Sequence, residues 1–245
     1  MSLSSSELEQ YDRQMLISGL GTDGQKKLKA AKVAVAGVGG LGCPASIYLA
    51  AAGIGKIVLV DNERFELNDL NRQILGWPKD IGRFKAEVAK EKLEALNSQI
   101  EAEAVVAEIT KDNVRNVIGD AEVVVDGQDN WKTRFIINEY CVAHNVRFIH
   151  AGVSALHGQI TTIVPGKGPC LRCIFPKDPP EREKIPVLGA TPALFASLQV
   201  METVKLVTGI GNPLVGRMLF ANGEEMVFET VEVKRNVRCP VCGNV

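Results

Sequence analysis

Apolar runs and helical repeats alternate along the first 150 residues of the chain. Short apolar segments predict strands at residues 32–36, 57–60, 103–106, 123–125 and 146–149. Apolar residues at helical spacing predict helices between them, at residues 41–52, 85–96, 113–118 and 131–144. Strands that alternate with helices in this way predict a parallel sheet connected by right-handed crossovers. Because the strands are rich in valine and isoleucine, we expect helices to cover both faces of this sheet.

The pattern differs at the two ends of the chain. Residues 1–6 are expected to be a disordered lead, and Ser6 is expected to cap a first helix. A loop at residues 19–24 and a short helix at residues 25–30 should follow. After about His150 the expected elements are a strand at 158–164, an exposed loop at 175–185, a long helix at 192–207, and strands at 218–220 and 226–233. The last two strands could pair as a hairpin about Asn222-Gly223, so antiparallel strands would extend the sheet.

Charge and composition exclude two classes of function. The chain has 28 Lys and Arg against 29 Asp and Glu, so it has no basic excess to attract nucleic acid or an anionic membrane. No apolar run approaches the roughly 20 residues that span a bilayer, and the polar N-terminus has no secretory pattern. We therefore expect a cytoplasmic protein, whose six cysteines would be metal ligands or buried thiols in a reducing compartment.

A glycine-rich loop follows the first predicted strand. Gly37, Gly39 and Gly42 form the pattern G-x-G-x-x-G between a strand and a helix. Such glycines let the backbone approach a phosphate or ribose, and the helix N-terminus offers unpaired N–H groups. Asp61 ends the next strand, where its carboxylate can accept hydrogen bonds from ribose hydroxyls. The pattern predicts an α/β fold with a Rossmann-type nucleotide site, but it leaves NAD, FAD and ATP open.

Two cations and an acid narrow the choice of nucleotide. Arg72 lies in a polar loop, Lys85 begins a helix, and Asp129 follows the fourth strand at the carboxyl edge of the sheet. The cations can neutralise a triphosphate, and a carboxylate can hold Mg²⁺. Taken singly, Arg72 could form a loop salt bridge and Lys85 could be an exposed helix residue. Either Asp129 or Asn130 could instead cap the helix that begins at Trp131. Together the three favour ATP over a dinucleotide.

Two cysteine pairs at metal-ligand spacing lie far apart in the chain, as Cys170-x-x-Cys173 and Cys239-x-x-Cys242. Four thiolates match a tetrahedral structural zinc, and with all four positions filled by protein no water ligand remains for catalysis. The alternative is a set of redox-active or idle thiols. The three histidines show no metal spacing and are expected to be surface or core residues. The two remaining cysteines are expected to be buried in the core: Cys43 and Cys141.

At these positions the sequence resembles the MoeB/ThiF/HesA family, the activating enzymes of sulfur-carrier and ubiquitin-like proteins. The resemblance covers nearly the whole chain, in order. Besides the glycine loop and Asp61, the motifs that carry it are Tyr11-Asp12-Arg13-Gln14, Leu70-Asn71-Arg72-Gln73, Lys85 in its Gly-x-x-Lys setting, Asp129-Asn130, Pro169-Cys170-Leu171-Arg172-Cys173, Leu198-Gln199 and Cys239-Pro240-Val241-Cys242.

The resemblance implies roles for individual residues. Gly40 would lie beneath the nucleotide, within a binding loop that also includes Gly37, Gly39 and Gly42, and Asp61 would hold the ribose. Asn71, Arg72 and Lys85 would contact the phosphates. Asp129 would bind Mg²⁺, with Asn130 beside it. Arg13 would reach the phosphates bound by the other subunit of a homodimer.

The resemblance also implies an activity. Residues 1–245 would form one adenylation domain, with N-terminal helices at 1–30, a nucleotide-binding half at 31–150 and a partner-binding half with the zinc knuckles at 151–245. The enzyme would use ATP to adenylate the C-terminal glycine of a small β-grasp sulfur-carrier protein that ends in Gly-Gly. A sulfurtransferase or desulfurase would then deliver sulfur, for molybdopterin, thiamine or another product.

The sequence departs from the family pattern in two places. Asp69 stands where the family usually has Asn, so a phosphate contact from that side chain is not expected. The loop at residues 175–189 has no cysteine, so we expect adenylation without an enzyme thioester. Three rival functions remain: adenylation of another carboxylate, on a peptide or a tRNA; an NAD-dependent oxidoreductase with structural zinc; and an inactive scaffold that binds a β-grasp protein.

Overall fold

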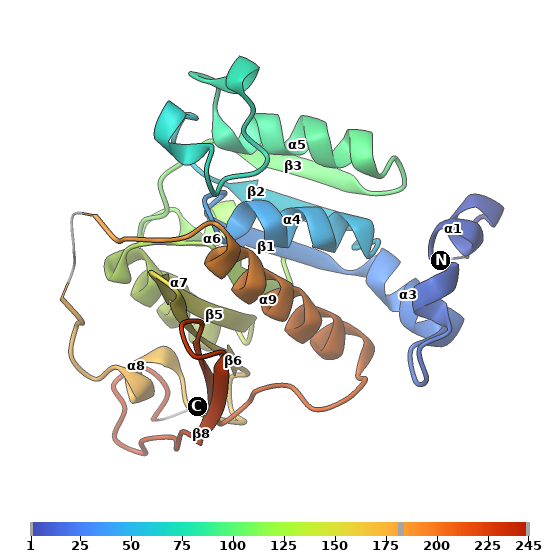
Figure 1. Ribbon diagram of the computed structural model, residues 1–245. Coiled ribbons are helices and arrows are strands. Elements are labelled where there is room, and N and C mark those ends of the chain that lie inside the picture. Colours follow the sequence, from blue (N-terminus) through green and yellow to red (C-terminus); the bar gives the residue numbers. More distant parts are fainter. Residues whose placement is uncertain (1, 181–183, 244–245) are drawn as a thin grey trace.

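Eight strands form a single sheet, in the order β3-β2-β1-β4-β5-β6-β7-β8 (Figure 1). The computed structural model describes residues 2–180 and 184–243. The strands are β1 Lys32–Ala36, β2 Lys56–Val60, β3 Glu101–Val105, β4 Val123–Asp126, β5 Arg147–Ser154, β6 His157–Ile163, β7 Arg217–Asn222 and β8 Val227–Glu232. Strands β1 to β5 pair in parallel, and β6 to β8 continue the sheet in antiparallel pairing. The predicted mostly parallel sheet with antiparallel C-terminal strands is therefore confirmed.

Helices cover both faces of the parallel part of the sheet. The helices are α1 Ser5–Gln10, α2 Asp12–Met15, α3 Gly21–Ala30, α4 Gly42–Ala51, α5 Lys85–Leu96, α6 Val114–Ile118, α7 Trp131–Ala143, α8 Leu171–Ile174 and α9 Ala190–Thr208, with 3₁₀ turns at Leu67–Asp69 and Pro78–Asp80. Helices α4, α5 and α9 share one core with the sheet, and α6 and α7 share the other (Figure 1). Side chains alternate between these two cores along each strand, since successive strand residues point to opposite faces.

The carboxyl ends of β1, β2 and β4 meet at one edge of the sheet, where the predicted site residues follow them. In register, Ala36 pairs with Val60 of β2 and with Asp126 of β4. The loops that leave these three strands therefore begin side by side. This is the edge at which ligands bind in open α/β sheets.

The N-terminal region contains more helix than predicted. Helix α1 begins at Ser5 and is capped by Ser4, in place of the predicted disordered lead and Ser6 cap. Residue 1 lies outside the described residues. The predicted loop at 19–24 is confirmed only for residues 19–20, because α3 begins at Gly21. The glycines disfavour a helix locally, but the buried side chain of Leu20 anchors its start.

In the second half of the chain, strand β5 is longer than predicted. Strand β5 continues past its predicted end at Ile149, because Gly152 and Ser154 pair with Gln159 and His157 of β6. Such long-range pairing leaves no local signal in the sequence. The predicted hairpin of the last two strands is confirmed. The expected exposed loop is irregular over residues 175–180 and 184–185, and its centre, 181–183, lies outside the described residues. None of the described helices combines the length and the apolar character needed to cross a bilayer.

Candidate functional site

The turn after β1 is built on glycines that the backbone requires. Gly37 has a φ of +97°, a conformation that favours glycine. A Cβ atom on Gly37 would lie 2.6 Å from the carbonyl oxygen of Gly127, and a Cβ atom on Gly42 would overlap the carbonyl oxygen of Gly37. Close packing of the turn against the loop after β4 therefore explains Gly37 and Gly42 without a ligand.

The other two glycines of the turn are less closely packed and leave room for a Cβ atom. A Cβ atom on Gly39 would lie 3.8 Å from its nearest neighbour, the Nε2 of Gln73, and one on Gly40 would lie 3.4 Å from Pro192. These are ordinary contact distances, so the protein itself does not require glycine at either position. At the start of α4 the N–H of Cys43 donates to the carbonyl of Gly39 at 2.9 Å, and Pro44 has no N–H. The N–H groups here that have no partner among the described residues are those of residues 39–42, in the turn itself. A phosphate or ribose could approach the backbone here.

Asp61 is attached directly to the glycine turn. Its Oδ2 accepts a hydrogen bond of 2.7 Å from the backbone N–H of Val38, and its Oδ1 accepts one of 2.8 Å from the N–H of Glu63. Burial raises the pKa of the Asp61 carboxyl, although these two hydrogen bonds lower it. The carboxylate is therefore held in place at the end of β2, as predicted for a ribose acceptor.

Asp69 holds the two predicted phosphate cations together. Its Oδ1 lies 3.2 Å from the guanidinium of Arg72, and its Oδ2 lies 3.5 Å from Nζ of Lys85. Its Oδ2 also accepts a hydrogen bond from the N–H of Glu66. The carboxylate that replaces the usual Asn thus has a structural role in this chain.

Lys85 is a buried cation and not an exposed helix residue, since only 3% of its surface is accessible. Its Nζ donates to the carboxylate of Glu63 at 2.6 Å. Burial lowers the pKa of Lys85, but this hydrogen bond and the charges of three nearby carboxylates raise it above its ordinary value. Lys85 therefore stays charged beside Asp61 and the glycine turn.

Arg72 combines the loop salt bridge with a place beside the turn. Its Nη1 donates to the carbonyl of Asn68 at 2.6 Å and to the side chain of Asn71 at 3.0 Å. Its Cγ would lie 3.6 Å from a Cβ atom on Gly40. Arg72 therefore forms the loop salt bridge that was one interpretation of the sequence. This salt bridge does not exclude phosphate binding, because the same side chain borders Gly40 of the turn.

The loop after β4 separates the roles of Asp129 and Asn130. The side chain of Asn130 caps α7 by accepting a hydrogen bond of 2.8 Å from the N–H of Thr133. Asp129 is exposed and makes no hydrogen bond or ion pair with the rest of the described chain. Since Asn130 is the cap, Asp129 is left free to hold a cation beside the turn.

Arg13 was predicted to contact phosphate, but its own chain does not bring it to the turn. It is exposed on α2, and its neighbour Gln14 donates to the carbonyl of Ala52 at the C-terminal end of α4. The glycine turn lies at the other end of this ten-residue helix, about 15 Å away at a rise of 1.5 Å per residue.

Sequence reasoning missed three polar residues near the turn. Glu63 pairs with Lys85, and the Oε1 of Gln73 is buried without a partner among the described residues. Asp126 ends β4, three residues before Asp129, and its carboxylate is fully buried. The sequence does contain a signal for Asp126, because an aspartate ends the otherwise apolar strand Val123–Asp126.

The four cysteines of the two pairs converge on one point. Their Sγ atoms all lie within 4.8 Å of one another, with 3.6 Å between Cys170 and Cys239 and 3.3 Å between Cys173 and Cys242. Tetrahedral zinc with Zn–S bonds of about 2.3 Å would require sulfur atoms roughly 3.8 Å apart. All six cysteines are free thiols in the described chain. The donor set therefore fits a four-thiolate metal site.

The two remaining cysteines are core residues, as expected. Cys43 and Cys141 are fully buried in opposite cores. Burial raises the pKa of the Cys43 thiol to about 12 and also raises that of Cys141. Neither thiol is a reactive nucleophile at neutral pH.

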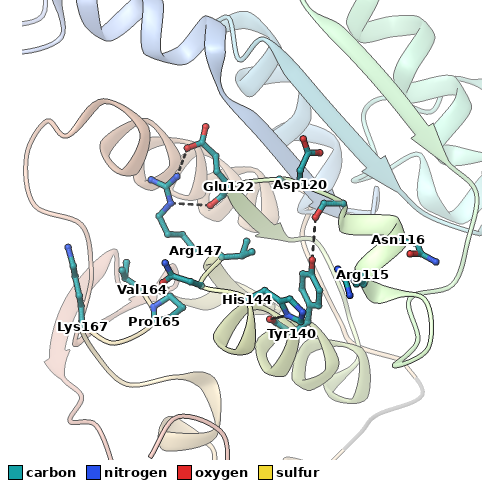
Figure 2. A pocket seen from close by; sticks show the side chains of 14 residues that line it. Arg115, Asn116, Asp120, Glu122, Tyr140, His144, Arg147, Val164, Pro165 and Lys167 are labelled. Carbon is teal, nitrogen blue, oxygen red and sulfur yellow. Dashed lines mark hydrogen bonds and ion pairs between the residues drawn. The ribbon is translucent and has the colours of Figure 1, made fainter. Parts of the chain in front are cut away.

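A cavity of about 950 Å³ lies at the opposite edge of the sheet from the glycine turn (Figure 2). It is bordered by the C-terminal ends of α6 and α7, where Tyr140 donates to the carbonyl of Gly119, and by Arg147, which pairs with Glu122. Helix C-termini carry partial negative charge, so they disfavour a phosphate. The cavity contains none of the predicted site residues and is not the nucleotide site.

Three kinds of comparison relate the chain to known proteins. The sequence profile of the ThiF family matches residues 11–241. The SAMP-activating enzyme E1 of Haloferax volcanii is 39% identical over 248 residues, covering 99% of this chain and 92% of its own length. The sulfur carrier protein adenylyltransferase of Thermus thermophilus is 38% identical over 248 residues, covering 97% of this chain and 92% of its own.

Solved structures of MccB from E. coli resemble the fold closely. The structure of MccB with ATP gives a TM-score of 0.87 at 29% identity, covering 96% of this chain and 75% of MccB. The structure with MccA-N7isoASN gives a TM-score of 0.89 at 28% identity, covering 99% and 76%. The likeness thus extends over both the parallel and the antiparallel parts of the sheet.

Proposed function

Because the chain belongs to the ThiF family and is an adenylyltransferase, we propose that it transfers AMP from ATP to the C-terminal glycine carboxylate of a small β-grasp protein. The proposal assigns residues 31–150 to nucleotide binding and residues 151–245 to partner binding. The acyl-adenylate would then receive sulfur from a sulfurtransferase or desulfurase. Membership of an adenylyltransferase family sets aside the rival interpretations as an oxidoreductase and as an inactive scaffold.

The observation that carries the proposal is the convergence of charge on the open part of the glycine turn. Arg72 borders Gly40, and Asp69 joins Arg72 to Lys85. Lys85 lies near Asp61, which accepts a hydrogen bond from Val38 of the turn. The carboxylate of Asp129 lies in the loop that packs against Gly37 from the other side. Two cations suit a triphosphate, which carries more charge than the pyrophosphate of a dinucleotide.

The chemistry follows from this placement. A carboxylate oxygen of the partner would attack the α-phosphorus of ATP, and the bond to the β-phosphate oxygen would break as pyrophosphate leaves with the electron pair. Arg72 and Lys85 would stabilise the charge that develops on the pyrophosphate, and the turn would align the reactants. Mg²⁺ held by Asp129 would add further neutralisation. The enzyme needs no side-chain nucleophile, which agrees with the lack of cysteine at residues 175–189.

Arg13 and the four paired cysteines would act away from the glycine turn of their own chain. Arg13 lies near the end of α4 that is far from its own turn, and its assignment to phosphate binding requires a homodimer in which it reaches the partner's site. The four cysteines would hold a structural zinc that clamps the C-terminal tail to α8. Since four sulfurs complete the coordination, the zinc would take no part in the reaction.

The two kinds of glycine in the turn give a matched pair of variants. We expect Gly42→Ala to unfold or strongly destabilise the protein, because the new Cβ atom overlaps the carbonyl oxygen of Gly37. We expect Gly40→Ala to leave the melting temperature within a few degrees, because its Cβ atom meets only ordinary contacts, but to weaken ATP binding at least ten-fold. Thermal melting and ATP titration of both variants measure this. Unchanged ATP affinity in Gly40→Ala would contradict a nucleotide on this backbone.

The partner can be tested by ATP–pyrophosphate exchange with purified candidate proteins. A β-grasp protein ending in Gly-Gly should stimulate exchange at least ten-fold and should acquire the mass of one AMP at its C-terminus. The same protein without its last glycine should do neither. Exchange that is equally fast with the truncated protein would refute recognition of the Gly-Gly end.

A second candidate substrate is the C-terminal carboxylate of a peptide. It is favoured by the close likeness to MccB, whose solved structures include complexes with MccA. The exchange assay distinguishes the two, since a short peptide with a free carboxyl terminus would then support exchange as well as a folded carrier does.

A further inference from the structure

A buried carboxylate organises the loop that carries Asp129. Asp126, at the end of β4, is fully buried and accepts three hydrogen bonds. Its Oδ2 lies 3.1 Å from Nε of Arg134 and 2.6 Å from Nδ1 of His150. Its Oδ1 accepts from the backbone N–H of Gln128 at 2.9 Å. The carboxylate thereby fixes the turn by which the chain leaves β4.

Arg134 extends this arrangement to the neighbouring strand. Its Nη2 donates to the carbonyl of Gln128 at 2.5 Å and to the carbonyl of Ala151 in β5 at 3.1 Å. Only 6% of its surface is exposed. Both the N–H and the carbonyl of Gln128 are therefore held by charged side chains, immediately before Asp129.

His150 completes the group from β5. The ring is fully buried, between Trp131 at 5.7 Å and Phe175 at 6.2 Å. Burial lowers the pKa of His150, despite the adjacent carboxylate, so the ring is neutral and donates from Nδ1. The net charge of the three side chains is then zero.

A buried ion pair of this kind is a poor source of stability compared with apolar residues of similar volume, because both charges must leave water. What it does supply is directional hydrogen bonding. Here these bonds fix backbone atoms of the loop that carries the unpaired Asp129 and that packs against Gly37. The side chain of Asp129 itself has no hydrogen bond or ion pair with residues 2–180 or 184–243 that would fix it.

We propose that Arg134, supported by Asp126 and His150, is a positioning residue that holds Asp129 in the orientation needed to bind a divalent cation with ATP. The inference rests on the proposed function, in which Asp129 is the cation ligand. In this proposal Arg134 is not a ligand of either substrate, and it acts through the backbone of Gln128.

The test compares Arg134→Lys with Arg147→Lys. Arg147 is a matched control, because it also joins β5 to the segment before β4, donating to the carbonyl of Glu122, but at the opposite edge of the sheet. The first readout is the Mg²⁺ concentration that gives half-maximal pyrophosphate exchange. The second is the fluorescence of Trp131, next to this loop, during titration with Mn²⁺ in the presence of ATP, with Trp77→Phe to remove the other tryptophan.

Arg134→Lys should raise the half-saturating Mg²⁺ and Mn²⁺ concentrations at least ten-fold and leave the KM for the protein partner unchanged. Arg147→Lys should leave all three at the wild-type value. If Arg134→Lys lowers only the melting temperature, with both cation responses unchanged, its role is structural and the inference is wrong.

Two further variants keep the test decisive. If Arg134→Lys does not fold, His150→Leu should raise the cation requirement several-fold, and His150→Gln should restore it by supplying a donor for Asp126. Asp129→Asn distinguishes a failure of the proposed cation ligand from a failure of the positioning role of Arg134. If it leaves the cation requirement unchanged, the proposed function has the wrong cation ligand. If it raises the requirement but Arg134→Lys does not, only the positioning inference fails.

Discussion

Arg72→Ala is expected to slow ATP–pyrophosphate exchange about 100- to 1000-fold, equivalent to about 2.7–4 kcal/mol of transition-state stabilisation. The side chain of Arg72 borders the turn, because its Cγ would lie 3.6 Å from a Cβ atom on Gly40. In the proposed reaction, its loss removes a two-pronged hydrogen-bond donor that would stabilise the charge developing on pyrophosphate. Because the side chain is partly exposed, the melting temperature should fall by only a few degrees.

The control for this prediction is Arg64→Ala, in the same connection between β2 and α5. Arg64 donates to the carbonyl of Gly82 at 2.6 Å and lies over the ring of Phe84 at 3.6 Å, so it has similar structural contacts. Its exchange rate should stay within a factor of three of wild type. If Arg72→Ala exchanged pyrophosphate as fast as Arg64→Ala, the assignment of Arg72 to phosphate binding would be wrong.

Replacing Cys170 with serine is expected to release bound zinc and to lower the stability of the protein substantially. The proposed metal joins residues about 70 positions apart, and a cross-link closing a loop of that length is worth about 4 kcal/mol. For a chain of this size that corresponds to a fall of roughly 8–16 °C in melting temperature. Zinc content by mass spectrometry of metals and a thermal melt measure both effects.

Cys141→Ala provides the comparison, because Cys141 is a buried thiol outside the metal cluster. It should keep one zinc per chain and lose about 1 kcal/mol from the small cavity. At a temperature where Cys170→Ser is still folded, its exchange rate per folded molecule should remain close to wild type. A full complement of zinc in Cys170→Ser, or a loss of activity without a loss of stability, would contradict a structural four-cysteine site.

The sequence predicted the parallel half of the fold well because its signals there are local. Strand Val123–Asp126 is buried throughout, and helix Lys85–Leu96 has the predicted bounds. Where tertiary contacts determine the bounds of an element, the predicted bounds were wrong. Helix α3 forms across two glycines because Leu20 and Gln25 are buried, and β5 extends through Gly152 because β6 pairs with it.

In the candidate site, too, local motifs identify residues but do not reveal their tertiary contacts. A motif can identify Arg72, Lys85 and Asp129, but it cannot reveal that Asp69 holds the two cations together. It also could not distinguish Asn130, the cap of α7, from the unpaired Asp129. The buried group about Asp126 was missed because its members come from three elements and no spacing connects them.

Calorimetric titration of ATP and of AMP into wild-type protein and Arg72→Ala, at fixed Mg²⁺, tests the central claim most directly. If positive charge converges on the turn to hold a triphosphate, Arg72→Ala should weaken ATP binding at least ten-fold and leave AMP binding within a factor of two. Equal effects on the two nucleotides, or no effect on either, would show that Arg72 does not face the β- and γ-phosphates and would contradict the account.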